Sequence, residues 1–583
     1  MSELGPRWLR QYDRSDARGD LRAGITVGVM LVPQGMAYAV IAGVPPIYGL
    51  YAGLIPLLVY PFLATSRHLA AGPVAIDMLI VAAGVGLLAQ ADPDRYLALI
   101  LLLTAMVGIL QLTMGLARLG FLVSFLARPV IAGFAAAAAI IIAFSQLGNL
   151  LGIELERSEY ILVVSYQALG AIQELDPVTF AVGLLSIALL VTIRRLPARI
   201  PGALVVVILG TVAATTLGLE ARGMEVVGEV PSGLPTPVLP AVNLADIRDL
   251  IPTALTLALI QFMSVISLSR LYATRHQYAI DPNRELLGVG AANLVGSFFR
   301  ALPISGSFSR TSVNDEFGAR TPLANTVAAG VVGLTLILLT PLFHNLPMAV
   351  LAAIIIVAAI GLIDLKELRY FFRTKPRDGR LALFTFTVTL LVGIREGILL
   401  GIAASTLAVL YRLSRPHVAE LGHLPGTRLF RDLDRTRDAH IMESILLLRV
   451  DAALYFFNAE YFKRFILSKS SQADRRIRAV ILDGMSINDL DTTAIEALEL
   501  IVDDLEAQEI ELHFTGLVGP VRDVIRYSGL YRRLGRRHFH ASPHQAVERI
   551  LESWDKWDDE DRLDQYLEEV GGGEEGVKPG LKE

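Results

Sequence analysis

The sequence predicts an α-helical polytopic membrane protein that ends in a smaller, soluble α/β domain. Hydrophobic residues make up 53% of the 583-residue chain and charged residues only 19%, whereas soluble chains are roughly 45–50% apolar and ~25% charged. Residues 20–415 hold long apolar runs with short connections, and residues 416–583 read as ordinary soluble sequence. Because a membrane-spanning helix needs ~20 mostly apolar residues, the successive runs indicate membrane spans rather than a buried soluble core.

About fourteen hydrophobic segments are expected in the first region, some of them half-helices. Their approximate cores are residues 23–42, 47–64, 70–88, 97–116, 121–148, 178–193, 201–218, 250–270, 284–299, 303–314, 322–342, 348–363, 381–393 and 395–412. With the N-terminus inside, the expected inner connections include the basic cluster Lys366–Arg380, and the outer ones include the acidic stretch 152–176 and the Pro-rich stretch 219–249. This positive-inside asymmetry predicts a multi-pass protein of the cell membrane with both termini cytoplasmic.

Two segments, the third and the tenth, contain small, helix-breaking and polar residues that a plain spanning helix avoids. The third carries Gly72-Pro73, and the tenth carries Ser305-Gly306-Ser307. In lipid, broken backbone survives only where protein buries it or a cavity wets it. Because the interruptions fall in equivalent places of the two halves, they favour a 7+7 inverted repeat and mark a transporter's binding site. A non-repeated bundle with incidental Gly and Pro is the alternative.

The soluble region begins after a polar, Arg-rich stretch, 416–437, that is expected to be a linker. Strands are expected at 445–450, 479–482 and 511–515, and helices at 493–506, 521–528 and 543–552. We therefore assign residues 1–415 to a transmembrane transport domain and 438–552 to the α/β domain. The acidic chain beyond residue 553 reads as a disordered tail.

Composition also excludes several classes of function. The net charge of −5 gives no global basic field for nucleic acid. The chain has no cysteine, so disulfides, thiol chemistry and Cys-type metal sites are excluded. The sequence contains no recognisable nucleophile–base pair, phosphate loop or metal cluster. We therefore expect neither an enzyme nor a bound metal or cofactor.

Several short motifs in the membrane region resemble the signatures of one known family. They are Val32–Ala39, Gly43–Tyr51, Thr65–His68, Gly72–Ala75, Asn283–Leu287 and Gly306–Arg310. In this order they resemble the sulfate-permease-type (SulP) anion transporters, the superfamily that includes the motor protein prestin. The C-terminal region resembles a STAS domain, with Asp491-Thr492-Thr493 at its strand-to-helix turn. There we expect helix capping rather than phosphorylation.

The resemblance implies a core domain and a gate domain, with an anion site between the third and tenth segments, and a homodimer. It implies the following substrate-binding residues: Gln34, Tyr38, Gly72, Val74, Ala75, Ser307, Phe308, Ser309 and Arg310. Elementary chemistry agrees with an anion site. Pro73 is suited to the first turn of a helix, and Gly306 can break the tenth segment. Two facing half-helix N-termini would supply partial positive charge and free N–H donors.

Each of these side chains also has a plainer interpretation. Ser307 and Ser309 can bind the anion or join helices by packing and hydrogen bonds. Arg310 can attract the anion or extend to the cytoplasmic surface. Gln34 and its neighbour four residues on, Tyr38, share one helix face and either line the site or bond to other helices.

Phe308 either forms a wall of the site or packs against neighbouring side chains.

The sequence departs from the family at the acidic residue that is associated with proton or cation coupling. Many bacterial relatives carry a glutamate in the eighth segment, whereas this chain has Ser264 at the matching place. Asp77 lies about one turn into the third segment, and an ionisable group at that depth is a functional candidate. It can pair with Arg310, titrate or bind a cation, and the alternative is a structural carboxylate.

The expected function is secondary transport or exchange of a small inorganic or organic anion by an elevator-like movement of core against gate, in contact with membrane lipid. Sulfate, bicarbonate, chloride and dicarboxylates all suit the same dipoles and hydroxyls. An uncoupled anion channel or a voltage-responsive motor-like protein is the alternative. A sensor or scaffold that depends on the STAS region is a third.

Overall fold

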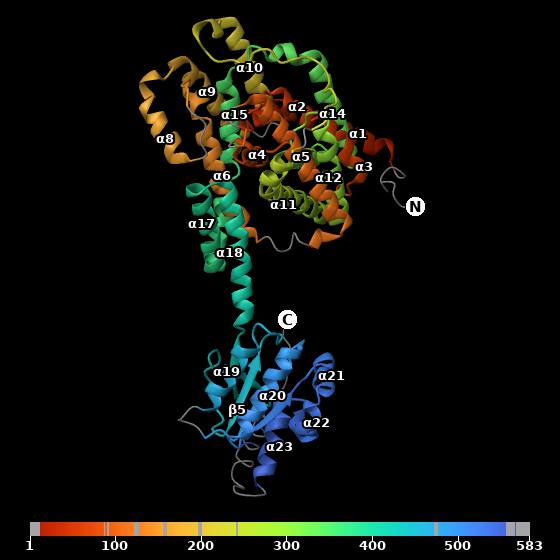
Figure 1. Ribbon diagram of the computed structural model, residues 1–583, viewed down its shortest axis with the longest axis vertical. Helices are drawn as coiled ribbons and strands as arrows, with labels where there is room; N and C mark the ends of the chain where they lie inside the picture. Colours follow the sequence, from red (N-terminus) through yellow and green to blue (C-terminus); the bar gives the residue numbers. More distant parts are fainter. Residues whose placement is uncertain are drawn as a thin grey trace, which may run out of the picture. The chain divides into compact units, whose positions relative to one another are not determined.

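The structure is a computed structural model that describes residues 12–86, 88–89, 92–121, 127–155, 160–195, 201–240, 243–471, 476–555 and 566. The chain divides into two compact units, Met1–Thr406 and Leu407–Glu583 (Figure 1). The first is almost entirely helical, and the second contains a six-stranded sheet. The predicted helical membrane core and C-terminal α/β domain are therefore confirmed. The expected tail lies, apart from the end of the last helix and Tyr566, outside the described residues.

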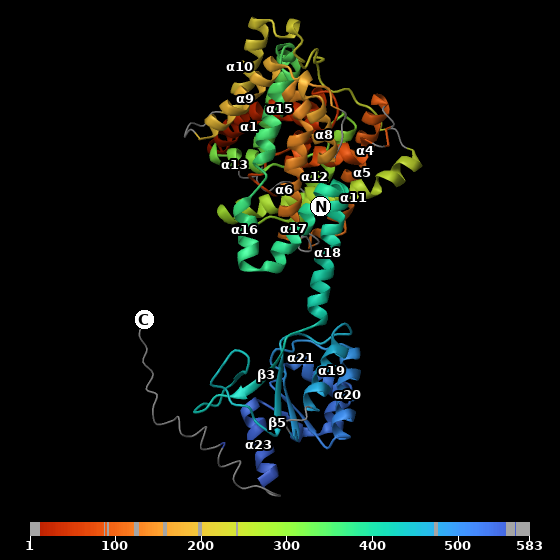
Figure 2. The same ribbon diagram turned by 90° about the vertical axis from the view of Figure 1, so that its left-hand side faces the viewer.

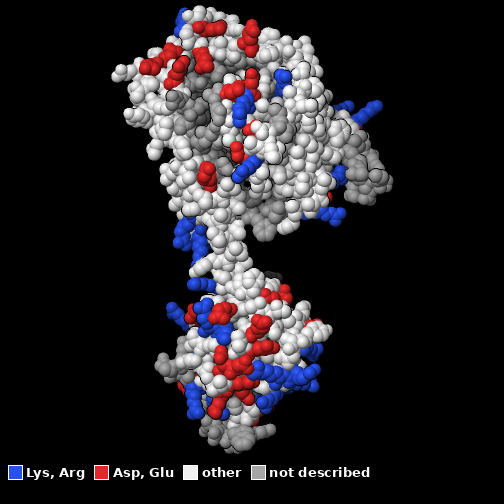
Figure 3. Space-filling model, viewed as in Figure 1, with Lys and Arg blue, Asp and Glu red and all other residues white. Residues whose placement is uncertain are grey.

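The helical unit is built from α1 to α18, the last of which ends in the second unit. Their bounds are α1 (Arg14–Ile41), α2 (Ile47–Ala52), α3 (Ile55–Leu63), α4 (Ala75–Gly86), α5 (Pro93–Leu116), α6 (Arg128–Ser145), α7 (Leu147–Leu151), α8 (Ile161–Gly170), α9 (Pro177–Arg195), α10 (Gly202–Leu217), α11 (Leu244–Arg275), α12 (Pro282–Ser297), α13 (Phe308–Glu316), α14 (Leu323–Leu334), α15 (Met348–Ile360), α16 (Leu365–Thr374), α17 (Pro376–Leu391) and α18 (Ile394–Ser414). Among the described residues, eight helical stretches are long and apolar enough to cross a membrane. Most of the face of this unit that Figure 3 shows is white, with acidic groups near its top and both acidic and basic groups near its middle.

Two helices lie where connections were expected. Helix α8 falls inside the stretch 152–176, because the run Ile161-Leu162-Val163-Val164 is apolar within otherwise polar sequence. Helix α16 opens the basic stretch near Lys366 (Figure 2). It exposes Leu365, Tyr370 and Phe372 beside its basic residues. Such an amphipathic helix suits the membrane–water interface. The sequence reading therefore underestimated the helical content of both connections.

Small residues allow the two helices that frame the site to approach closely. On α1, a Cβ added to Gly24 would lie 2.5 Å from the carbonyl oxygen of Ala324 on α14, and one added to Gly28 would lie 2.9 Å from that of Ala328. Glycines four residues apart occupy one helix face and let backbones meet, as is typical of helix pairs in membranes. This contact fixes α1, which carries Gln34 and Tyr38, against α14.

The second unit contains a sheet of order β4-β3-β5-β6-β7-β8. Its strands are β3 (Val418–His423), β4 (Phe430–Asp432), β5 (Ile445–Val450), β6 (Ala479–Asp483), β7 (Glu511–Thr515) and β8 (Phe539–His540). Strands β5 to β8 are parallel, and β3 and β4 are antiparallel additions. The helices are α19 (Ala459–Ser470), α20 (Thr492–Glu506), α21 (Gly519–Tyr527), α22 (Leu530–Leu534) and α23 (Pro543–Asp555). The predicted strands and helices all occur, with end shifts of at most a few residues.

The stretch 416–437 is not the linker that the sequence suggested. It contributes β3 and β4 to the sheet, and β3 pairs with β5 from Val418 opposite Val450. Its polar composition reflects an edge position, since β4 ends the sheet. The helix start at Asp491 is capped as expected, because its carboxylate accepts a hydrogen bond from the Ala494 N–H.

Candidate functional site

The two interrupted segments meet in the helical unit. Strand β1 (Ala71–Gly72) pairs antiparallel with β2 (Ser305–Gly306). The Ser307 N–H extends this ladder by donating to the Ala70 carbonyl oxygen over 3.2 Å. Helix α4 begins at Ala75 and α13 at Phe308, each directly after its strand. The N-termini of two helices are thereby brought together at one place, as the paired interruptions predicted.

Side chains from neighbouring helices satisfy the backbone groups that the broken helices leave free. The Ala70 N–H donates to Thr311 Oγ1 over 3.1 Å, and the Ala71 N–H donates to Asn325 Oδ1 over 3.0 Å. On the other strand, the Ile304 N–H donates to Asn293 Oδ1 over 2.8 Å. An unpaired backbone group in an apolar interior is costly. These polar side chains therefore make the interruption possible.

Arg310 is the central charged group of this arrangement, and it is fully buried. Its Nη2 donates to the Pro73 carbonyl oxygen over 2.9 Å, and its Nη1 donates to Gln34 Oε1 over 3.4 Å. Among the described residues, its Nε has no hydrogen-bond partner. A buried guanidinium with a free N–H calls for an acceptor. Arg310 therefore links the α13 start to the α4 start and retains a donor for a further group.

Gly72 makes room for that guanidinium. Its φ of +141° is a conformation that side-chain-bearing residues rarely adopt, and an added Cβ would lie 3.0 Å from Arg310 Nη2. The next two predicted residues follow at the helix start, with Val74 half-buried and Ala75 buried. The chain thus bends tightly around the arginine where α4 begins.

The predicted hydroxyl groups lie at the first turn of α13. Ser307 caps the helix, and its Oγ accepts a long hydrogen bond of 3.5 Å from the Arg310 N–H. The Ser309 hydroxyl lies 3.3 Å from that of Ser307. Ser307 is buried, whereas Ser309 and Phe308 are exposed, Phe308 by 59%. The two exposed side chains therefore do not pack in the core of the helical unit.

Helix α1 supplies the opposite wall. Gln34 and Tyr38 are both largely buried on one face of α1. Gln34 contacts Arg310 directly, and Tyr38 is close enough to Arg310 for the two groups to interact electrostatically. The structure thus places four of the predicted residues, Gln34, Tyr38, Gly72 and Ser307, against one arginine.

Asp77 occupies the first turn of α4 and is buried. Its Oδ2 accepts hydrogen bonds from Ser305 Oγ over 2.6 Å and from Gln261 Nε2 over 3.2 Å. Arg310 donates its hydrogen bonds to other groups. Asp77 lies within electrostatic range of Arg310, but its hydrogen-bond partners are both neutral. Ser264 lies one turn beyond Gln261 on α11 and is half-buried.

A chain of amides behind Asp77 was not singled out from the sequence. Gln261 Oε1 accepts from Gln111 Nε2 over 2.9 Å and from Asn293 Nδ2 over 3.0 Å. The three side chains come from α11, α5 and α12 and are fully buried. The signal was present, since each is a lone amide in an apolar segment, and polar groups in membrane helices usually bond across helices.

Glu285, within the Asn283–Leu287 motif, has a structural role. Its carboxylate accepts from the Tyr60 hydroxyl over 2.7 Å, from the Thr65 N–H and hydroxyl over 2.6 Å each, and from the Ser66 N–H over 2.7 Å. The carboxylate is fully buried. Glu285 thereby anchors the connection that leads into β1 to the start of α12.

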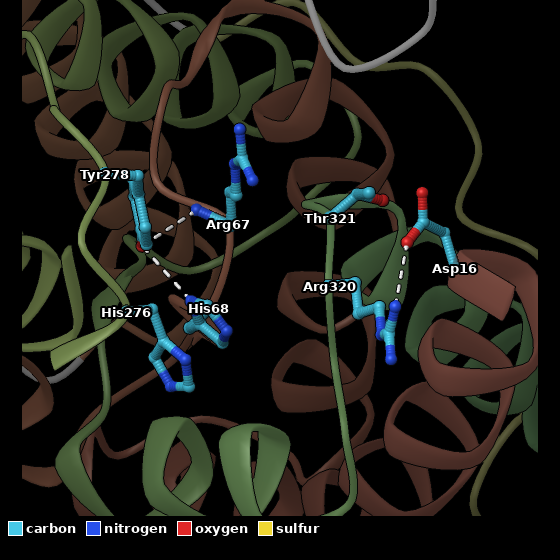
Figure 4. A pocket seen from close by; sticks show the side chains of 7 residues that line it. All are labelled: Asp16, Arg67, His68, His276, Tyr278, Arg320 and Thr321. Atoms are coloured by element: carbon cyan, nitrogen blue, oxygen red, sulfur yellow. Dashed lines mark hydrogen bonds and ion pairs between the residues drawn. The ribbon is translucent and has the colours of Figure 1, made fainter. Parts of the chain in front are cut away.

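A polar hollow of about 290 Å³ lies at the other end of α13 (Figure 4). It is lined by Asp16, Arg67, His68, His276, Tyr278, Arg320 and Thr321. The rings of His68 and His276 stack with centroids 4.1 Å apart. Burial, reinforced by His276, lowers the pKa of His68 to about 4. Helix α13 has nine residues and is therefore about 13 Å long, with Arg310 in its first turn and this hollow at its far end.

Comparison with known proteins follows the same division of the chain. The profile described as the Sulfate permease family matches residues 18–387, and that of the STAS domain matches residues 436–546. The chain is 34% identical over 584 residues to sulfate transporter 4.1, chloroplastic, of Arabidopsis thaliana, covering 97% of this chain and 85% of the relative. It is 35% identical over 540 residues to a probable sulfate transporter of Mycobacterium tuberculosis, covering 93% and 96%. The solved structure of the murine Solute Carrier 26 family member A9 anion transporter, in the inward-facing state, matches with a TM-score of 0.86 at 25% identity and 93% coverage of each chain.

Proposed function

Because this chain belongs to the sulfate permease family and carries a STAS domain, we propose that it is a secondary transporter or exchanger of small anions. Family membership makes it a membrane transport protein rather than an enzyme. The proposal adds a substrate site at Arg310 and alternating access by an elevator-like movement. Sulfate is the first candidate substrate because two relatives are named sulfate transporters. Bicarbonate, chloride and dicarboxylates are the competitors.

The observation that carries this proposal is the free Nε of buried Arg310 between two helix starts. Each helix N-terminus is equivalent to about +0.5 of an elementary charge. The α4 and α13 starts therefore add to the guanidinium charge rather than oppose it. The exposed Ser309 hydroxyl offers a donor beside them. An oxyanion or halide placed there would satisfy the free N–H and balance the local positive charge.

The test is counterflow in proteoliposomes with a panel of sulfate, bicarbonate, chloride and dicarboxylate, with and without sodium and proton gradients. We expect saturable uptake by the wild type and its loss, or a fall of more than about tenfold, in Arg310→Ala, since charged hydrogen bonds contribute ~1.5–3 kcal/mol. Arg248→Ala is the matched control, because Arg248 is exposed on α11. Normal uptake kinetics in Arg310→Ala, with correct insertion, would overturn the site.

Measurements on the same vesicles distinguish exchange from channel activity. Saturable, counter-anion-dependent uptake supports the transporter, whereas large ohmic currents support the alternative of an uncoupled channel or a voltage-responsive protein. Deletion of the STAS domain tests the sensor alternative. Loss of function on deletion, combined with no effect of Arg310→Ala, would favour a sensor or scaffold.

The proposal also includes a cell-membrane location with both termini cytoplasmic. The absence of cysteine from the chain allows single cysteines to be introduced without further changes. Ser468→Cys, exposed on α19, should be labelled only from the cytoplasm, and Ser232→Cys, exposed in the stretch 219–249, only from outside. Labelling in the reverse pattern would invert the topology.

A further inference from the structure

Four titratable side chains gather on one face of the sheet in the second unit. Glu511 and His513 lie two residues apart on β7, and His538 and His540 lie two residues apart at β8. Because successive side chains of a strand point to opposite faces, Glu511 and His513 share a face of the sheet. His538 ends the 3₁₀ turn Arg536–His538 directly before β8, and its ring lies beside that of His513, with centroids 4.8 Å apart. Strands β7 and β8 are parallel, with Thr515 opposite His540. The pattern Glu-x-His on one strand and His-x-His at the next therefore places four potential ligands together.

The side chains are close enough to act as one group. His513 Nε2 lies 3.3 Å from Glu511 Oε2, and His513 Nδ1 lies 3.1 Å from His540 Nε2. One ligand atom from each of Glu511, His513 and His538 lies within 4.8 Å of the other two. Ligands of one tetrahedral ion at ~2.0–2.2 Å stand roughly 3.3 Å apart. Small side-chain rotations are therefore enough to complete the geometry.

Hydrogen bonds already orient two of the imidazole rings. The Leu534 carbonyl oxygen contacts His538 Nδ1, and a carbonyl can only accept, so Nδ1 carries the proton and Nε2 keeps its lone pair. If His513 Nδ1–H donates to His540 Nε2, the His513 Nε2 lone pair faces Glu511. Metal-binding histidines are typically held by such a bond from the second ring nitrogen.

Burial and access also suit a bound ion. The His513 side chain is only 5% exposed, whereas that of Glu511 is 42% exposed. His538 and His540 are buried, and His540 Nδ1 has no hydrogen-bond partner among the described residues. Three imidazoles therefore pack together beside a partly exposed carboxylate.

We propose that Glu511, His513 and His538 bind a divalent transition-metal ion of the Zn²⁺ class, with His540 as a residue that positions His513. Two imidazoles and a carboxylate are a common donor set for Zn²⁺. The chain has no cysteine, so no thiolate competes for the ion. The bound ion would tie the β8 end of the sheet to β7, independently of the anion site in the membrane unit.

The proposal is tested on the full-length protein in detergent, with any affinity tag removed and metals stripped by a chelator. Zn²⁺ binding is measured by competition with a chromophoric chelator, and Co²⁺ binding by its visible absorption. We expect about one ion per chain in the wild type. Glu511→Gln, His513→Gln and His538→Gln should lose it, and His540→Phe should weaken it about tenfold or more.

Two controls separate this site from other histidines. His440→Gln changes an exposed histidine of the same unit. His276→Gln disables a second group, His68, His276 and Asp315, whose ligand atoms also lie within 4.8 Å of one another. Both should keep the ion. Of the proposed ligands, Glu511 has the most exposed side chain, so Glu511→Gln should disturb folding less than the histidine variants. Unchanged Zn²⁺ affinity in Glu511→Gln and His538→Gln, or loss of the ion only in His276→Gln, would overturn the proposal.

Discussion

Replacing Gly72 by alanine tests how closely the chain is fitted around Arg310. The new Cβ would lie 3.0 Å from Arg310 Nη2 and 3.3 Å from Leu31 Cδ1, so the guanidinium must shift by a few tenths of an ångström. Nη2 also donates to the Pro73 carbonyl oxygen over 2.9 Å, and this bond would be stretched or lost. A hydrogen bond to a charged group contributes ~1.5–3 kcal/mol. If the whole loss appears in anion binding, the KM for uptake should rise about 10- to 100-fold.

The φ of +141° adds a second, separable effect. An alanine held in a sparsely populated conformation costs ~1–3 kcal/mol, and this strain is present with and without anion. It should lower the melting temperature in detergent, whereas displacement of Arg310 should raise the KM. Gly86→Ala is the matched control, because Gly86 ends the same helix, α4, and a Cβ there meets nothing within 4 Å. A Gly72→Ala protein with wild-type KM would refute the placement of the anion beside Arg310.

Three further outcomes are expected. Asp77→Asn should flatten any pH dependence of uptake while leaving exchange measurable, and an unchanged pH profile in proteoliposomes would make Asp77 structural. Burial lowers the pKa of His68 from 6.5 to about 4, so the unfolded chain takes up a proton first as the pH falls. The free energy of unfolding should therefore fall by up to ~3 kcal/mol as the pH drops from 6.5 to about 4. His68→Gln should remove that part of the acid sensitivity in thermal melts. The expected homodimer should appear as two chains per particle by mass photometry in nanodiscs, and a monomer at all concentrations would contradict it.

The sequence was informative where one residue type has few structural uses. Gly72-Pro73 and Gly306 interrupt apolar segments, and breaks of that kind in lipid require a special local structure. The strand at 445–450 could be located because it is a short apolar run, and the strand at 511–515 because apolar Leu512 and Phe514 alternate with polar residues. Both depend on local chemistry, so no distant partner had to be known.

The sequence was less informative where the partner of a residue lies far along the chain. Asn325 bonds to Ala71 across 254 positions, and nothing near either residue indicates that contact. Edge strand β4 was missed for a different reason, because its residues Phe430-Arg431-Asp432 carry little apolar signal. The histidine group at β7 and β8 required the parallel pairing of two strands before its two short motifs could be recognised as one cluster.

The contacts around the site also indicate which elements would move with it. The starts of α4 and α13 are joined by the β1–β2 pair, and hydrogen bonds fasten that pair to Asn293 of α12 and Asn325 of α14. Asp77 adds a bond to Gln261 of α11. An elevator requires the binding site to travel as a rigid body, and this network supplies one, since separating any member would leave buried polar groups unpaired. Gln34 of α1 and Gln111 of α5 belong to the same network. If the site moves, we expect α1, α4, α5, α11, α12, α13 and α14 to move together.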